Sequence, residues 1–265
     1  MKNLAVLCMA LLLNNACATV ESPHMATGIK IGEVTDTEAN VWVRLTLNEA
    51  RVDFGGPLPI VTYTHVDTGE PVTEVRGRPR YAVPHVEFPD GSSVATLEGA
   101  VPGAEGVVRV RYRPESETEF AATPWSSVDP DADFTHQFRL TGLKPGTRYA
   151  LSVDYGANRS AAHESLGGAF RTAPAADTIE PVIFTVVTGQ RYPNRDADDG
   201  WKIYAEMQNL DPNFFVHTGD ILYYDQLGKT EDLANWHWQR TYSLKSLVEF
   251  HRNVASYFIK DDHDT

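Results

Sequence analysis

The chain has 265 residues, of which 42% are hydrophobic and 22% are charged, a composition typical of a globular protein with one or two domains. Its formal net charge of -13 argues against a nucleic-acid-binding surface, because an acidic protein repels phosphates. Both cysteines, Cys8 and Cys17, lie near the amino terminus. The remaining sequence therefore has no disulfide, no thiolate zinc site and no cysteine nucleophile.

Residues 1–18 have the pattern of a secretory signal peptide. A single positive residue, Lys2, precedes an apolar run from Leu4 to Leu13 and the small residues Ala16-Cys17-Ala18. The run is about half the ~20 residues that a membrane-spanning helix needs. We therefore expect an exported protein, periplasmic or secreted, without a transmembrane span. A lipid anchor at Cys17 stays open, because Leu-x-x-Ala-Cys loosely matches a bacterial lipoprotein signal.

Residues 25–173 alternate apolar and polar side chains at the period of a β-strand, which predicts a β-sandwich. The segment 140–153, "LTGLKPGTRYALSV", is set as in fibronectin type III-like domains, where a corner tyrosine, here Tyr149, bonds back to the backbone. We expect Trp42 to be buried on an early strand. The long interval 47–134 predicts an inserted hairpin or extra strands.

Residues 174–181 read as a linker, and from residue 182 the pattern changes to alternating strands and helices. This order predicts an α/β unit with a parallel sheet, whose ligands bind at the carboxyl ends of the strands. The predicted strands are 182–188, 212–217 and 256–259; the predicted helices are 199–210, capped by Asp198 or Asp199, and 231–254.

Acidic residues follow the second and third predicted strands. Taken alone, each loop has an explanation without a ligand. The first would be only a turn at Gly219-Asp220, and the second would be a solvated acidic turn at 261–264. If the strands are neighbours, however, the loops converge, and crowded carboxylates need a counter-charge, which predicts a bound cation. The residues brought together would be Asp220, Tyr223, Asp261, Asp262, His263 and Asp264.

These segments resemble the N-terminal portion of the alkaline phosphatase D (PhoD-like) family of the metallophosphoesterase superfamily. The matching segments are "MATGIKIGEVTDTEANVWVRL", "GLKPGTRYALSV", "FTVVTGQRYPN", "FFVHTGDILYYD", "WQRTY" and "DDHD". The resemblance implies two domains: a fibronectin type III-like β-sandwich at 25–173, then the first part of an α/β metallophosphoesterase-type sandwich at 182–265. It also implies an exported hydrolase that cleaves small or polymeric phosphate esters, mono- or diesters, by a metal-activated hydroxide.

The resemblance assigns roles to individual residues. Asp220 would bridge two metal ions, and Tyr223 and Asp262 would bind one each. His263 would be catalytic, assisting the leaving oxygen. The family metals are calcium and iron, so two or more divalent or trivalent ions per site are expected.

Two further residues, Arg240 and Gln190, each have two possible roles. Arg240 would face the site and hold a substrate oxyanion, or it would be a surface arginine paired with Glu231 or Asp232. Gln190 would bind substrate, or with water fill a vacant ligand position in the first loop. His237 and His251 lie on an apolar helix stripe and are expected to be structural.

Two departures from the family bear on activity. Gly189 stands where the family has a cysteine ligand, so iron is in question and calcium, manganese or zinc are alternatives. The family sequence also continues beyond "DDHD", so we expect an N-terminal fragment with half a site and one uncovered flank of its sheet, inactive by itself. The altered loop leaves open a sulfate-ester or polysaccharide-directed hydrolase, and a non-catalytic surface or binding protein with a degenerate site.

Overall fold

The structure is a computed structural model that describes residues 22–75, 80–162, 164–225 and 227–264. The signal peptide and the lipid anchor at Cys17, predicted within residues 1–18, lie outside these ranges. No helix in the described ranges is both long enough and apolar enough to cross a membrane.

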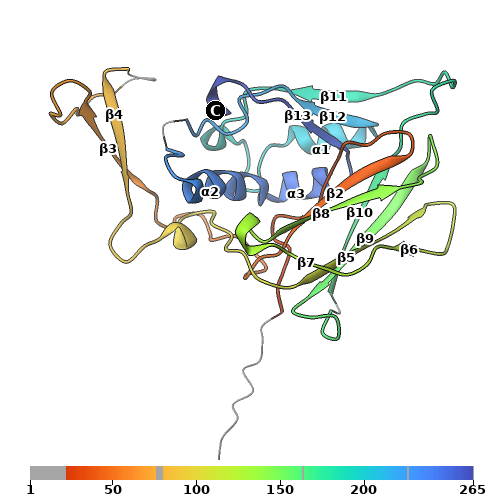
Figure 1. The fold of residues 1–265 in the computed structure, drawn as a ribbon. Helices are drawn as coiled ribbons and strands as arrows, with labels where there is room; N and C mark the ends of the chain where they lie inside the picture. Colours follow the sequence, from red (N-terminus) through yellow and green to blue (C-terminus); the bar gives the residue numbers. More distant parts are fainter. Residues whose placement is uncertain (1–21, 76–79, 163, 226, 265) are drawn as a thin grey trace, which may run out of the picture.

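The first part of the chain is a sandwich of two antiparallel sheets (Figure 1). Apolar side chains of both inner faces pack into one core, as the alternation predicted. Among the residues at the centre of this core are Val41, Val110 and Val153, each 0% exposed. One sheet has the order β1 (Lys30–Gly32), β2 (Glu38–Arg44), β8 (Thr135–Thr141). The other has the order β10 (Glu164–Arg171), β9 (Arg148–Gly156), β5 (Val107–Pro114), β6 (Ala121–Ala122), with β7 (Ser126–Ser127) also paired to β5.

The corner tyrosine and the inserted hairpin are both confirmed. The Tyr149 hydroxyl accepts a hydrogen bond of 2.8 Å from the backbone N–H of Lys144. The hairpin consists of β3 (Ile60–His65) and β4 (Ala82–Glu87), which stand away from the sandwich in Figure 1. Two short 3-10 turns, η1 (Val94–Thr96) and η2 (Pro130–Ala132), lie between the hairpin and β8.

The prediction that Trp42 is buried in the sandwich was wrong. Val41 and Val43 of β2 point into the core, so Trp42 between them points to the opposite face. It is half-buried there and borders a cavity on the side of the sandwich that faces the helices.

The second part of the chain is an α/β unit whose three strands are parallel neighbours, as predicted. Their order is β11 (Phe184–Val187), β12 (Phe214–His217), β13 (Ser256–Phe258). Figure 1 shows α2 (Glu231–Tyr242) and α3 (Lys245–His251) between this sheet and the sandwich. The remaining elements are α1 (Ile203–Asn209), η3 (Tyr192–Asn194) and η4 (Asp262–Asp264). The other face of the sheet carries exposed apolar side chains, among them Phe184, Val186 and Ile259.

Two helix predictions were wrong. The predicted helix 231–254 is two helices, because Leu244 takes an extended conformation and turns its side chain into the core. Neither Asp198 nor Asp199 caps the first helix, which begins at Ile203 without a side-chain cap. A carboxylate oxygen of Asp196 instead accepts a bond of 3.0 Å from the N–H of Lys202.

Polar contacts join the two parts of the chain. Asp133, just after η2, accepts bonds from Arg44 (2.8 Å) and from the Gln239 amide of α2 (3.0 Å). The Tyr257 hydroxyl of β13 donates to the Val34 carbonyl at 3.0 Å. The sandwich therefore fixes the position of the helices and of the sheet above them.

Because two imidazoles are buried in the fold, we expect acid to destabilise it. Burial, together with a smaller effect of the nearby positive charge of Arg240, lowers the pKa of His237 to about 3. The unfolded chain takes up this proton near pH 6.5, the ordinary imidazole value, whereas the folded chain does not. Stability is therefore lost as the pH falls below 6.5. His251, 0% exposed, also has a lowered pKa for the same main reason.

Replacing His237 tests this account. His237→Phe should reduce the slope of unfolding free energy against pH, between pH 6.5 and 4, by about 1.4 kcal/mol per pH unit. Urea denaturation at a series of pH values measures the slope. His85→Phe, at an exposed position of β4, is the matched control. An unchanged slope in His237→Phe would contradict the assignment.

Candidate metal centre

Parallel pairing places the loops after β11, β12 and β13 at one edge of the sheet. Backbone bonds join the first two loops directly. The N–H of Gly189 donates to the Gly219 carbonyl at 3.2 Å, and that of Gln190 donates to the Asp220 carbonyl at 2.9 Å. The first and second loops therefore form one surface.

A buried carboxylate joins the third loop to the second. Asp264 is 0% exposed and accepts bonds from the N–H groups of Ile221 (2.8 Å) and Leu222 (3.1 Å). It also accepts a bond of 3.3 Å from the N–H of Asp261, and its own carbonyl accepts one from Tyr224. Asp264 was predicted to be among the clustered acids; its contacts show that it organises the loops.

Asp220, Asp262 and His263 offer ligand atoms that all lie within 4.8 Å of one another. Asp220 has a positive φ of 54°, and Gly219 before it has a φ of 109°. A Cβ at Gly219 would lie 2.5 Å from the Cβ of Asp261, so this close approach of the two loops requires glycine. Three residues predicted as site residues are thus brought together.

The donor set fits a cation. The Tyr223 hydroxyl donates to Oδ2 of Asp220 at 3.0 Å, while Oδ1 of Asp220 is buried with no hydrogen-bond partner among the described residues. Burial raises the pKa of Tyr223, and the bond to Asp220 raises it further. The hydroxyl proton of Tyr223 thus lies between the phenol oxygen and Oδ2 of Asp220. A cation bound by both oxygens would replace this proton. A deprotonated Tyr223 requires such a cation.

His263 is held by two contacts. Its Nδ1 lies 3.0 Å from Oδ1 of Asp225, and its ring centroid lies 4.2 Å from that of Tyr223. A carboxylate bonded to one imidazole nitrogen fixes the orientation of the ring. Asp225 was not among the predicted site residues, although its place five residues after Asp220, in the same loop, was a usable signal.

Gln190 and Gly189 lie beside this group. Gln190 is buried; its Oε1 accepts a bond from the Tyr204 hydroxyl, and its Nε2 has no partner in the described part of the chain. A Cβ at Gly189 would lie 3.5 Å from the Tyr223 hydroxyl oxygen, so a side chain at this position would reach the ligand group. Gly189 has a φ of 68°, which favours glycine.

Arg240 lies outside this group and contacts the first loop through Tyr192. Its guanidinium carbon lies 3.8 Å from the centroid of the Tyr192 ring and 4.4 Å from that of Trp236. The alternative that Arg240 is a surface residue was wrong, since it is only 8% exposed. Burial lowers its pKa to about 10.

Further arginines surround Tyr192. The guanidinium carbon of Arg195 lies 4.7 Å from the Tyr192 ring centroid, and that of Arg51 lies 5.5 Å from it. The Tyr192 hydroxyl donates to Glu98 at 3.2 Å. Three arginines with one adjacent carboxylate leave positive charge next to the first loop.

Comparison with known proteins agrees with this geometry. Residues 184–265 match the PhoD-like phosphatase family. The predicted resemblance is confirmed over this segment. Among solved structures, "Structure of PhoD" superposes on 90% of the chain with a TM-score of 0.58 at 15% identity. The purple acid phosphatase PPD1 from yellow lupin (Lupinus luteus) seeds superposes on 89% with a TM-score of 0.51 at 10% identity. No curated protein sequence matches the chain.

The likeness to PhoD and to the lupin enzyme establishes the fold: a β-sandwich followed by a partial phosphatase-type domain. The chain spans 39% of the length of the PhoD structure and 35% of that of the lupin enzyme.

We expect substitution of Asp264 to cause a large loss of stability. Asp264→Ala leaves buried N–H groups of Ile221 and Leu222 without an acceptor, so the free energy of unfolding should fall by about 2–3 kcal/mol. Asp262→Ala, at an exposed position, should change it by less than about 0.5 kcal/mol. Urea denaturation of both variants, without added metal, measures the difference. Equal effects would disprove the organising role of Asp264.

Proposed function

We propose that the complete protein is an exported, metal-dependent hydrolase of phosphate esters. The grouping of Asp220, Asp262 and His263 at the carboxyl edge of a parallel sheet carries the proposal. The match of residues 184–265 to the PhoD-like phosphatases supports it. We keep residues 25–173 and 182–265 as the proposed domains and 1–18 as the proposed signal peptide.

Asp220, Tyr223 and Asp262 would hold the metal ions. Bound ions supply a Lewis acid, which lowers the pKa of water and neutralises charge on the phosphoryl group. His263, oriented by Asp225, donates a proton to the leaving oxygen. The Nε2 of Gln190 donates a hydrogen bond to a phosphoryl oxygen.

Arg240 acts together with Arg51 and Arg195 around Tyr192. Their positive charge, opposed by Glu98, attracts an anionic ester toward the first loop in an otherwise acidic protein. The contacts place Arg240 against Tyr192, which follows Gln190 by two residues. We therefore assign Arg240 to positioning the loop and binding the substrate anion.

Hard cations suit this donor set. Carboxylate and phenolate oxygens with one imidazole are ligands for calcium, manganese or ferric iron. With Gly189 in the first loop, no thiolate is available there, and Tyr223, whose hydroxyl oxygen lies 3.5 Å from the Cβ position of residue 189, would be the ligand nearest this loop. We propose that Tyr223 would hold calcium or manganese there, or ferric iron through its phenolate oxygen.

The same glycine favours a second candidate. A chain that has lost one ligand while keeping the fold would be a non-catalytic binding protein. Metal content separates this candidate from the hydrolase, because a binding module has no need of stoichiometric ions.

Metal analysis of an Asp220 variant tests the proposal. The protein expressed from its full reading frame should carry about two ions per chain, and Asp220→Ala should lose at least one together with at least ~100-fold of its phosphoesterase activity. Elemental mass analysis measures the ions. Asp90→Ala, at an exposed loop position, is the control. A wild-type protein without stoichiometric metal would favour the binding module.

Gly189→Cys tests the first-loop position. A thiolate there would lie next to Tyr223, so the iron bound per chain should increase relative to wild type. Because the backbone has a positive φ, the variant should also lose about 1–2 kcal/mol of stability. Gly189→Ala is the matched control: it should show the same loss without the gain in iron. An equal iron content in both variants would show that residue 189 does not reach the metal.

A further inference from the structure

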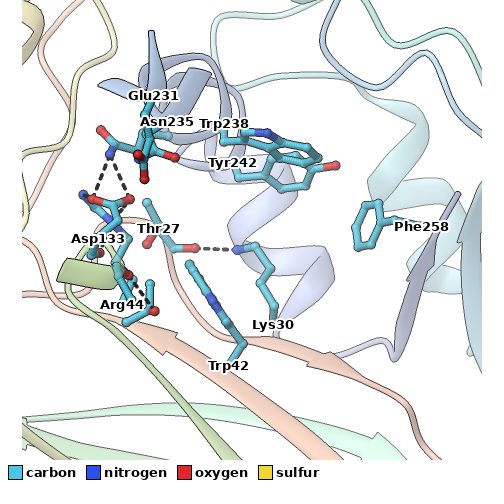
Figure 2. Close-up of a pocket in the computed structure, with 13 residues that line it drawn as sticks. Thr27, Lys30, Trp42, Arg44, Asp133, Glu231, Asn235, Trp238, Tyr242 and Phe258 are labelled. Atoms are coloured by element: carbon cyan, nitrogen blue, oxygen red, sulfur yellow. Dashed lines mark hydrogen bonds and ion pairs between the residues drawn. The ribbon is translucent and has the colours of Figure 1, made fainter. Parts of the chain in front are cut away.

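A cavity of about 430 Å³ lies between the sandwich and α2 (Figure 2). This volume falls within the range of small-molecule sites, which often lie at domain interfaces. Strands β1, β2 and β13, helix α2 and the turn before β8 contribute to its walls. None of the residues assigned to the metal centre lines it.

One end of the cavity is aromatic. Trp42 of β2 forms one wall, and Trp238 and Tyr242 of α2 form the wall opposite. The rings of Trp238 and Tyr242 are stacked, with centroids 5.5 Å apart and planes inclined by 24°. Figure 2 shows the Lys30 side chain extending between these walls, with its amine below Tyr242 and above Trp42. Flat apolar walls of this kind suit a planar ring.

The Lys30 amine makes few polar contacts that replace the hydrogen bonds to water that it loses on folding. It donates to the Thr27 carbonyl at 2.5 Å and lies 5.7 Å from the centroid of the Tyr242 ring, and it forms no ion pair with any residue that the structure describes. Burial lowers the pKa of Lys30 to about 7. The facing groups are Trp42, Tyr242 and Phe258, with the imidazole of His251 behind them. None of them supplies negative charge at neutral pH.

The acids of the cavity are at its other end. The Asp133 carboxylate accepts two bonds from Arg44, at 2.9 and 2.8 Å, and two from the Gln239 amide nitrogen, at 3.2 and 3.0 Å. Glu231 lies at an exposed position beside them. Figure 2 shows this polar group apart from Lys30. Among the described residues that line the cavity, no carboxylate is therefore placed to supply a counter-charge to the amine at the aromatic end.

We propose that this cavity binds a small planar organic acid, whose ring lies beside Lys30 against the Trp238–Tyr242 pair and whose carboxylate accepts a hydrogen bond from Lys30. The ligand's negative charge compensates the amine of the half-buried Lys30, and its ring fills the apolar space. The site is separate from the metal centre and does not depend on the hydrolase proposal.

Titration with phenylacetate, an aromatic carboxylate, tests the proposal. Calorimetry should show saturable binding of one molecule per chain, accompanied by a change in tryptophan fluorescence. Phenylacetamide, which has the same shape without the charge, should bind at least ~10-fold more weakly. Affinity should be highest below pH 7, where Lys30 is protonated, and should fall above pH 7. Absence of saturable phenylacetate binding, or equal binding of the amide, would overturn the proposal.

Variants assign the binding to Lys30. Lys30→Met keeps the apolar stem and should weaken phenylacetate binding by at least ~10-fold while leaving the unfolding temperature unchanged or higher, because a desolvated charge is removed. Lys202→Met, at an exposed position before α1, is the matched control and should bind like wild type. Wild-type affinity in Lys30→Met would overturn the assignment. If Lys30→Met does not fold, the comparison of acid with amide and the pH profile on the wild-type protein decide the question.

Discussion

Parallel pairing of β11, β12 and β13 is the constraint on which the candidate site depends. The register aligns Val187 with His217 and His217 with Phe258, so the three strands end at one level and their loops leave from the same edge. The Asp264 carboxylate then fixes the third loop against the second. Neither contact involves a substrate or a metal, so the site is largely preorganised by the fold.

The sandwich contributes more than a rigid support. Arg51 lies in a loop of the first part of the chain, and it reaches Tyr192 in the first loop of the α/β unit. On the other side of α2, Lys30 and Trp42 complete a cavity with side chains of the same helix. Helix α2 takes part in both features: the carbonyl of its Arg240 accepts a bond of 2.6 Å from Arg51, and its Trp238 and Tyr242 line the cavity. This helix is therefore the link between the two regions.

Sequence patterns predicted the elements better than the direction of individual side chains. Alternation identified the sandwich but not the face of β2 on which Trp42 lies. Val41, Trp42 and Val43 are all apolar, so the sequence does not show which of them points into the core. A helical stripe predicted one helix at 231–254, because a single extended residue, Leu244, leaves hydrophobic periodicity almost unchanged. The role of Asp264 was equally hidden, since a carboxylate that binds backbone N–H groups and one that binds a metal look alike in sequence.

The sequence by itself determined the two types of fold, their order along the chain and the loops in which acids and a histidine follow buried strands. It did so because strand periodicity, turn residues and short motifs are local properties. Only the tertiary structure decided that Asp225 orients His263, that Arg240 packs on Tyr192, and that Lys30 extends between aromatic walls. These contacts join residues from different elements, and their geometry is set by how strands, helices and the sandwich pack together.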